Sequence, residues 1–407
     1  MLTMPIDLTL KQIREAQEAI RPYVHRTVMD RSGTLSSLTG AEIYLKMESL
    51  QKTGSFKIRG AMNKVRTLSD EDQARGVIAA SAGNHAQGVA MAAARMGIPA
   101  TIVMPENAPL AKVSATEGYG ARVILSGAVF DDAYQKAVEI QKETGATFIH
   151  AFDDLEVMAG QGTIGLEIFE ELPEVDAVLV PIGGGGLIAG IAVALKSLKP
   201  SVGIIGVQAA GAASMAHALS LGRPESLRQA STLADGIAVK RAGELTFAAV
   251  RHYVDEIVTV EEEEISQAIL LLMERTKTLA EGAGAVAVAA ALQGKLNLRD
   301  QKTVLILSGG NIDVNFLAQI IERGLRRSGR TMACQLLLPD QPGNLEKVIE
   351  LIAQERANII NIGHSRYDLD VPLRSACVHM LLETQSFEHQ KRITQRLEGA
   401  GYLLTVN

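Results

Sequence analysis

One lysine stands in an unusually apolar setting, in the stretch ESLQKTGSFKIRGA at residues 48–61. Lys57 directly follows Phe56, with Gly54 and Ser55 before it. A poorly hydrated lysine can lose its proton and then act as a nucleophile or as a base. A solvated surface lysine is the ordinary alternative, so Lys57 alone does not establish any chemistry.

Three further stretches rich in glycine or serine could complete a site around such a lysine. They are SAGNH at 81–85, GGGGL at 183–187 and LSGGN at 307–311. Each follows a short apolar run, and loops at the carboxyl ends of parallel strands line a common crevice. The joint occurrence of the lysine and the three loops therefore predicts one site.

The GGGGL stretch lies between the apolar run AVLVPI and the helical pattern IAGIAVALKSL. Backbone amides at such a helix N-terminus can bind a phosphate, although a plain tight turn has the same glycines. A Rossmann dinucleotide loop fits less well, since Ile188 stands at the sixth position of its motif. Lys199 and Ser201 also stand where that motif needs an acidic residue.

The SAGNH stretch also precedes a helical pattern. Its amides and the side chains of Ser81 and Asn84 could therefore bind a carboxylate. His85 could be a general base, or it could simply order the start of the helix. Ser308 in LSGGN either lines the crevice or caps a helix.

The elements that must position these residues follow from hydrophobic periodicity. Helical patterns alternate with the apolar runs GVIAAS, ATIVMP, ARVILS, TFIHA, AVLVPI, VGIIGVQ, EIVTV and TVLILS. This alternation predicts parallel βαβ units in two α/β lobes, the smaller at about residues 55–153. Nearer the N-terminus we expect an amphipathic helix over 8–23, irregular chain over 26–40 and a strand at IYLKME.

The chain changes character after residue 325. A polar connector at 326–331 precedes residues 332–407, whose pattern follows the order β-α-β-β-α-β. That order predicts a ferredoxin-like α+β sandwich without evident catalytic residues. We therefore expect a larger domain over 1–325 and a separate C-terminal domain.

Composition excludes several classes of protein. The 407 residues are 47% hydrophobic and 21% charged, with a net charge of −6 and no Trp, so a nucleic-acid partner is not expected. Cys334 and Cys377 lack the spacing of a zinc site or a disulfide framework, which fits a reducing cytoplasm. No apolar run is long enough for a membrane span, and the N-terminus lacks a signal peptide's apolar core.

A reactive lysine, a phosphate cradle and a carboxylate-binding loop together meet the needs of pyridoxal 5'-phosphate acting on amino acids. Residues 1 to about 325 also resemble the fold-type II, tryptophan synthase β-like pyridoxal-phosphate enzymes. Within that family the chain resembles the threonine/serine dehydratases. The resemblance rests on SFKIRGA, SAGNHAQG, GGGGL and LSGGN, which occur in that order.

The resemblance implies a role for each matching residue. Lys57 would hold the cofactor and remove the substrate Cα proton, Phe56 would pack beside the ring, and Ser308 would meet the pyridine nitrogen. The phosphate would bind to the glycine loop, formed by Gly183, Gly184, Gly185, Gly186 and Leu187. The substrate carboxylate would bind to Ser81, Ala82, Gly83, Asn84 and His85, with Asn84 also bonding the ring 3'-oxygen, while Glu281 would orient groups near the cofactor.

The implied reaction converts L-threonine to 2-oxobutanoate and ammonia, and L-serine to pyruvate. A serine racemase or a hydroxyaspartate dehydratase would share nearly every motif, and a non-catalytic amino-acid sensor is a further alternative. Members of the family that bind a divalent cation carry an acidic residue where Gln208 stands here, so we expect no metal.

The C-terminal residues 332–407 resemble an ACT domain, with LLLPDQPGNLEKV as its first strand, turn and helix. Such domains bind amino acids, usually between two copies. Because this chain has one copy, the resemblance implies a homo-oligomer, a dimer or a tetramer. Its activity would respond to an amino-acid effector such as isoleucine or valine.

Overall fold

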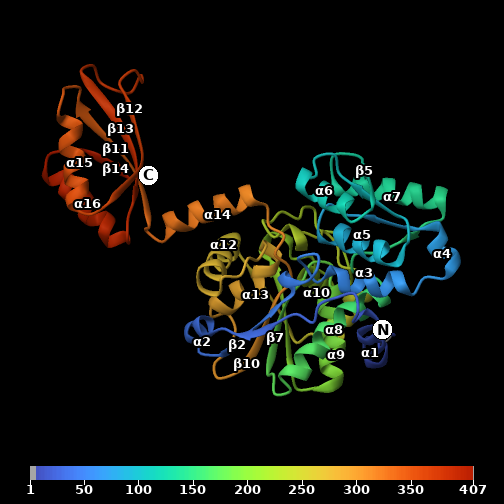
Figure 1. The fold of residues 1–407 in the computed structure, drawn as a ribbon. Helices are drawn as coiled ribbons and strands as arrows, with labels where there is room; N and C mark the ends of the chain where they lie inside the picture. Colours follow the sequence, from blue (N-terminus) through green and yellow to red (C-terminus); the bar gives the residue numbers. More distant parts are fainter. Residues whose placement is uncertain (1–5, 407) are drawn as a thin grey trace. The chain divides into compact units, whose positions relative to one another are not determined.

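The computed structural model describes residues 6–406, which form two compact units that meet in the sequence between Ile312 and Asp313. The first unit holds two parallel-sheet lobes and the second an antiparallel sheet (Figure 1). This arrangement confirms the predicted fold class of two α/β lobes and a separate α+β domain. Among the described residues, no helix is both long and apolar enough to cross a bilayer.

The larger lobe is built on a six-stranded sheet in the order β1-β2-β10-β7-β8-β9. All neighbours pair in parallel except β1, which runs antiparallel to β2. Its strands are β1 (Met29–Arg31), β2 (Glu42–Met47), β7 (Ala177–Pro181), β8 (Gly203–Ala209), β9 (Glu256–Val260) and β10 (Lys302–Leu307). Its helices are α1 (Leu10–Ile20), α2 (Gly33–Thr39), α8 (Leu155–Glu171), α9 (Gly186–Leu198), α10 (Ser214–Leu221), α11 (Glu244–Tyr253), α12 (Glu262–Leu271) and α13 (Gly282–Leu292).

The smaller lobe has a four-stranded parallel sheet in the order β5-β4-β3-β6. Its strands are β3 (Val77–Ala80), β4 (Ala100–Met104), β5 (Arg122–Leu125) and β6 (Thr147–Phe148). Its helices are α3 (Lys57–Arg66), α4 (Asp70–Arg75), α5 (Asn84–Met96), α6 (Leu110–Gly118) and α7 (Phe130–Thr144). The apolar strands and the alanine-rich α5 pack into one core. This packing fixes the position of each loop that follows a strand.

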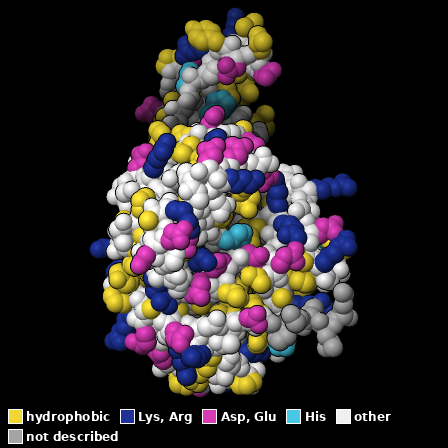
Figure 2. Space-filling view, turned by 90° about the vertical axis from the view of Figure 1, so that its right-hand side faces the viewer, with side chains coloured by type: hydrophobic (Ala, Val, Ile, Leu, Met, Phe, Trp, Pro, Cys, Tyr) yellow, Lys and Arg dark blue, Asp and Glu magenta, His cyan; other side chains and the backbone are white. Residues whose placement is uncertain are grey.

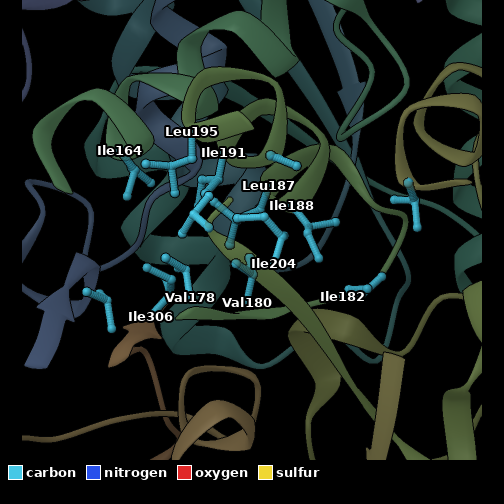
Figure 3. Packing of buried hydrophobic residues seen from close by; sticks show 14 of the residues in the cluster. Ile164, Val178, Val180, Ile182, Leu187, Ile188, Ile191, Leu195, Ile204 and Ile306 are labelled. Atoms are coloured by element: carbon cyan, nitrogen blue, oxygen red, sulfur yellow. The ribbon is translucent and has the colours of Figure 1, made fainter. Parts of the chain in front are cut away.

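Branched aliphatic side chains form the core beneath the larger sheet. Figure 3 shows Val178, Val180, Ile204 and Ile306 of the sheet packed against Ile188, Ile191 and Leu195 of α9. Each such fully buried side chain stabilises the fold by about 1.5–3 kcal/mol. This packing anchors β7 and α9, the two elements that flank the glycine loop.

The prediction of irregular chain over 26–40 is wrong. Residues 29–31 pair with β2 as a short antiparallel strand, and α2 follows directly. Ser32 caps α2 by accepting a hydrogen bond from the Leu35 amide, and Gly40 ends it with φ +71°. Residues 33–39 of the stretch predicted to be irregular therefore form a short capped helix.

The second unit begins with α14 (Val314–Arg327), after which Ser328 to Arg330 lead into the sheet. The following elements are β11 (Thr331–Pro339), α15 (Asn344–Gln354), β12 (Asn358–Ser365), β13 (Ser375–Glu383), α16 (Phe387–Gly399) and β14 (Leu404–Val406). The antiparallel sheet has the order β12-β13-β11-β14, as a ferredoxin-like sandwich requires. Alternate residues of β11 and β13 form a core with Val348 of α15 and Leu397 of α16.

Candidate active site

A cavity of about 890 Å³ opens in the first unit where the loops after β3, β6, β7 and β10 converge. Every predicted site residue lines it. These residues are Phe56, Lys57, Ser81, Ala82, Gly83, Asn84, His85, Gly183, Gly184, Gly185, Gly186, Leu187, Glu281 and Ser308. The carboxyl ends of parallel strands lie at one edge of a sheet, and this brings together residues as far apart in the sequence as Phe56 and Ser308.

Lys57 is the first residue of α3, and its Nζ donates a hydrogen bond to the Ala151 carbonyl oxygen at 2.9 Å. Burial lowers the pKa of this amine to about 8, although the Glu281 carboxylate acts in the opposite direction. The segment before it is held by the Phe56 amide, which donates to Ser308 O at 3.1 Å. The structure therefore presents an amine that is partly neutral near physiological pH.

Asn84 is held from both sides by a chain of side-chain hydrogen bonds. Its Nδ2 donates to Glu281 Oε1 at 2.7 Å, and its Oδ1 accepts from Asn311 Nδ2 at 2.8 Å. Burial and the charge of Asp235 raise the pKa of Glu281 to about 7, while the bond from Asn84 opposes them. One Asn84 amide proton remains for the cavity, because a carboxamide carries two donors.

Ser308 is buried, and its hydroxyl donates to Ala283 O at 3.3 Å. The helix-cap alternative for Ser308 is wrong, because Asp313 caps the next helix, α14, by accepting from the amides of Asn315 and Phe316. Ser308 thus lies in the cavity wall at the end of β10, as the crevice interpretation requires.

The glycine loop connects β7 to α9, as predicted. Among residues 6–406, the backbone amides from Gly183 to Ile188 donate to no acceptor, whereas Ile182 N donates to Val207 O and Ala189 N to Gly185 O. Gly185 has φ +100°, a conformation that favours glycine. Free amides at the positive end of a helix form an anion cradle, so the loop fits a phosphate.

The SAGNH loop presents a second helix N-terminus to the same cavity. Ser81 Oγ accepts a hydrogen bond from the Gly83 amide at 3.2 Å. Within the described part of the chain, the amides of Asn84, His85 and Ala86 at the start of α5 have no acceptor. They are available for a carboxylate.

His85 donates from Nε2 to Ile149 O at 2.8 Å and is buried. Burial, and secondarily the charge of Lys57, lowers the pKa of His85 to about 3. A ring that resists protonation to this degree is a poor general base, so the geometry favours the ordering role for His85.

The cavity residues that follow β6 were not predicted from the sequence. Phe152 packs against the glycine loop so closely that a Cβ on Gly184 or Gly186 would overlap it. Asp153 accepts hydrogen bonds from three amides at the start of α11, and His150 lines the cavity. The sequence could have indicated these residues, because they directly follow a parallel strand, β6, as the other site loops follow β3, β7 and β10.

Two ion pairs connect the lobes at the cavity. Lys112 of α6 lies 2.7 Å from Asp235, and Asp131 of α7 lies 2.8 Å from Lys240. All four residues line the cavity. The face in Figure 2 carries interspersed acidic and basic side chains rather than a broad basic area.

Gln208 is buried at the end of β8 and is bonded to protein atoms. Its Oε1 accepts from the Ala216 amide at 2.9 Å, and its Nε2 donates to Ile182 O at 3.3 Å. Among residues 6–406, no group of three or more His, Cys, Asp or Glu side chains is placed to hold a metal ion.

Comparison with known proteins gives the context of this site. A family model described as "Pyridoxal-phosphate dependent enzyme" matches residues 20–309. Over 395 residues the chain is 53% identical to an L-threonine ammonia-lyase of Thermotoga maritima, covering 97% of this chain and 98% of that relative.

Two solved structures share the fold. The processed form of threonine deaminase isoform 2 from Solanum lycopersicum has a TM-score of 0.74 at 39% identity, covering 78% of this chain and 97% of that one. Maize serine racemase also has a TM-score of 0.74 at 39% identity, covering 79% and 98%. Because proteins with different names match equally well, the fold alone does not choose between elimination and racemisation.

Proposed function

The chain belongs to the family of pyridoxal-phosphate dependent enzymes, and we propose that its cavity converts L-threonine to 2-oxobutanoate and ammonia, and L-serine to pyruvate. The relative named L-threonine ammonia-lyase, which matches nearly the whole chain, supports this choice of substrate. One observation carries the proposal. Within the described structure, a lysine amine of lowered pKa and a row of backbone amides without acceptors meet in a single cavity.

The cavity fits both anchoring groups of pyridoxal 5'-phosphate. The amides from Gly183 to Ile188 would bind the phosphate, and the Lys57 amine would hold the aldehyde carbon. Phe56 would pack beside the ring, the second amide proton of Asn84 would meet the ring hydroxyl, and Ser308 would meet the pyridine nitrogen. When bound, the cofactor supplies an electron sink for the bond that breaks at Cα.

The side chains of this protein would bind and orient the substrate. The free amides at the start of α5, within the Ser81–His85 loop, would bind the α-carboxylate. Lys57 Nζ, held at Ala151 O, would take the Cα proton, which its lowered pKa permits near neutral pH. Glu281 would act through Asn84 by holding that side chain in place.

The test is a 2-oxobutanoate assay on purified protein with L-threonine, together with the absorbance of the bound cofactor. We expect ketoacid and a cofactor band from the wild type, and neither from Lys57→Ala. Lys64→Ala is the matched control, because Lys64 lies on the same helix and pairs with Asp154 at 2.7 Å. A wild type that forms the cofactor band but no ketoacid from threonine or serine would refute the proposed reaction.

Serine racemisation is a second candidate, supported by the equal structural similarity to maize serine racemase. It needs the same cofactor anchors and the same removal of the Cα proton. Chiral analysis of the serine that remains after incubation separates the two reactions. D-serine without pyruvate would favour the racemase.

We also propose that residues 332–407 form an ACT domain that binds an amino-acid effector, isoleucine or valine, and that the protein is a homo-oligomer. The element order of the second unit supports the domain assignment. Two free cysteines are compatible with a reducing cytoplasm. Titration of isoleucine and valine into the activity assay, with light scattering for the mass, tests the effector and the assembly.

A further inference from the structure

His150 is a cavity residue that the proposed function leaves without a role. It follows β6, and its Nδ1 accepts hydrogen bonds from the amides of Phe152 (3.3 Å) and Asp153 (2.9 Å). An imidazole nitrogen that accepts from amides carries no proton, so a neutral ring must carry its proton on Nε2. The backbone of the chain thereby selects one tautomer.

Burial, more than the surrounding charges, keeps the ring of His150 neutral. Burial lowers its pKa, and the cation of Lys57 adds to that effect, while the carboxylates of Asp153 and Asp154 oppose it. The neighbouring His85 is itself a neutral donor to Ile149 O. His150 is therefore a hydrogen-bond donor of fixed orientation at physiological pH.

The position of His150 decides what this donor can reach. The residue after it, Ala151, accepts from Lys57 Nζ, and the next residue, Phe152, packs against the glycine loop. The imidazole lines the cavity and stands edge-on to the Phe152 ring, with the centroids 4.7 Å apart. Among residues 6–406, no acceptor is bonded to its Nε2, so the N–H is available to a ligand in the cavity.

We propose that the Nε2–H of His150 donates a hydrogen bond to the β-hydroxyl oxygen of the substrate and thereby selects hydroxy amino acids. This inference rests on the proposed function, which assigns the other polar groups. The amides of α5 take the carboxylate, Lys57 takes the Cα proton and the glycine loop takes the phosphate. The substrate amino group would react with the cofactor, which leaves the β-oxygen as the remaining polar atom of threonine and serine. A fixed neutral donor suits an oxygen that gains negative charge as its bond to carbon weakens.

The test compares L-threonine with L-2-aminobutyrate, which differs from it only in lacking the β-oxygen. Holoenzyme is titrated with each ligand, and affinity is read from the change in cofactor absorbance, with kcat/KM measured for threonine. We expect His150→Asn to lower the threonine affinity and kcat/KM by about 10- to 100-fold, the loss expected when a buried oxygen is left without its hydrogen-bond donor. The affinity for L-2-aminobutyrate should change less than about twofold, because that ligand makes no such bond.

A matched variant separates the donor from the scaffold. Asparagine at 150 can replace Nδ1 as acceptor for the two amides but does not reach as far as Nε2. Glutamine at the same position carries a terminal amide donor further out, so His150→Gln should recover part of the preference for threonine. If His150→Asn fails to take up cofactor, the same comparison is made with His150→Gln and with His150→Ala.

Three outcomes would overturn the inference. They are an equal loss of affinity for both ligands, full kcat/KM for threonine in His150→Asn, and a wild type without preference for the β-hydroxyl ligand. A wild type that binds threonine more tightly than L-2-aminobutyrate but produces no ketoacid would refute the proposed reaction and leave the hydrogen bond supported.

Discussion

Lys57 and Arg59 are two cations on the same turn of α3, and both are largely withdrawn from water, yet their surroundings differ completely. Lys57 lines the cavity and bonds one carbonyl oxygen. Arg59 is fully buried and makes two hydrogen bonds to each of Glu48 and Glu167, at 2.6–3.0 Å. The contrast shows that ionic partners, rather than burial alone, decide whether a cation stabilises the fold or performs chemistry.

The pKa values express this difference. Burial lowers the pKa of Lys57 to about 8, because Glu281 compensates only in part. Burial acts in the same direction on Arg59, but two carboxylates outweigh it and raise its pKa. The two buried carboxylates also shift in opposite directions. The pKa of Glu281 is raised to about 7, whereas that of Glu167 is lowered by Arg59 and Lys46 despite its burial.

The largest effect should come from Lys57→Met, which keeps an apolar side chain of similar length and removes the amine. We expect at least a 10³-fold loss of kcat/KM for threonine, since base catalysis alone contributes about 10²–10⁴-fold. The free energy of unfolding of the cofactor-free protein should change by less than about 1 kcal/mol, because within residues 6–406 the amine bonds a carbonyl oxygen and no carboxylate. The ketoacid assay measures the loss of kcat/KM, and urea unfolding measures the free energy of unfolding. A large loss of stability would contradict the claim that Lys57, unlike Arg59, does not stabilise the fold.

Arg59→Met should give the reverse result. Removing Arg59 leaves two buried carboxylates without their main partner, which costs about 3–5 kcal/mol in the free energy of unfolding. Urea unfolding of the cofactor-free protein measures the loss. Arg59→Lys should recover only part of it, because an ammonium cannot make paired bonds to two carboxylates at once.

The two glutamates offer a finer test through pH. The raised pKa of Glu281 means that the folded state binds more protons than the unfolded state between pH 4.5 and about 7, so stability falls as pH rises through that range. Glu281→Gln should therefore raise the Tm of the cofactor-free protein at pH 8, on the order of 2–4 °C, and the gain should vanish below pH 4.5.

Glu167→Gln should have the opposite sign. The lowered pKa of Glu167 gives stability that is present above its unfolded pKa and is lost as pH falls through its folded value. This variant should therefore lower the Tm at pH 8 and approach the wild type in acid. Thermal melts at pH 4, 6 and 8 compare the two variants, and curves of the same sign would contradict the distinction between the two sites.

The smallest expected effect concerns the rate at which apoprotein takes up pyridoxal 5'-phosphate. Only a neutral amine attacks the aldehyde, so the rate should rise with pH and level off above about 8 rather than near the ordinary lysine value. Glu281→Gln removes a charge that raises the pKa of Lys57, and the midpoint should move to lower pH. A shift to higher pH would contradict the assigned influence of Glu281.

Much of the catalytic unit could be predicted from local patterns. Apolar runs such as VIAA at 77–80 and AVLVP at 177–181 form strands, because they are bracketed by glycine-rich turns and helical periods. The glycine stretch and the lysine motif could also be recognised, since close backbone approach and positive φ at Gly185 require that residue type. The strands, the glycine stretch and the lysine motif each depend on residues that are adjacent in the chain, so they can be recognised from the sequence.

The role of His150 could not be predicted in this way. Its tautomer depends on two backbone amides that donate to the ring, and its proposed role depends on a cavity assembled from several loops distant in the sequence. The short strand β1 was likewise missed because it is defined by pairing with β2 rather than by its own residues. Pairing across distance is decided by packing, which a local pattern does not contain.

The sequence by itself determined which residue types were present for the chemistry: an amine, glycines that expose backbone amides, and a carboxamide. Only the tertiary structure decided that, in the part of the chain described, no carboxylate contacts Lys57, whereas two contact Arg59, two residues later. The physical reason is that the energy of a buried charge depends on groups brought close from distant segments, here residues 48 and 167 for Arg59 and residue 151 for Lys57.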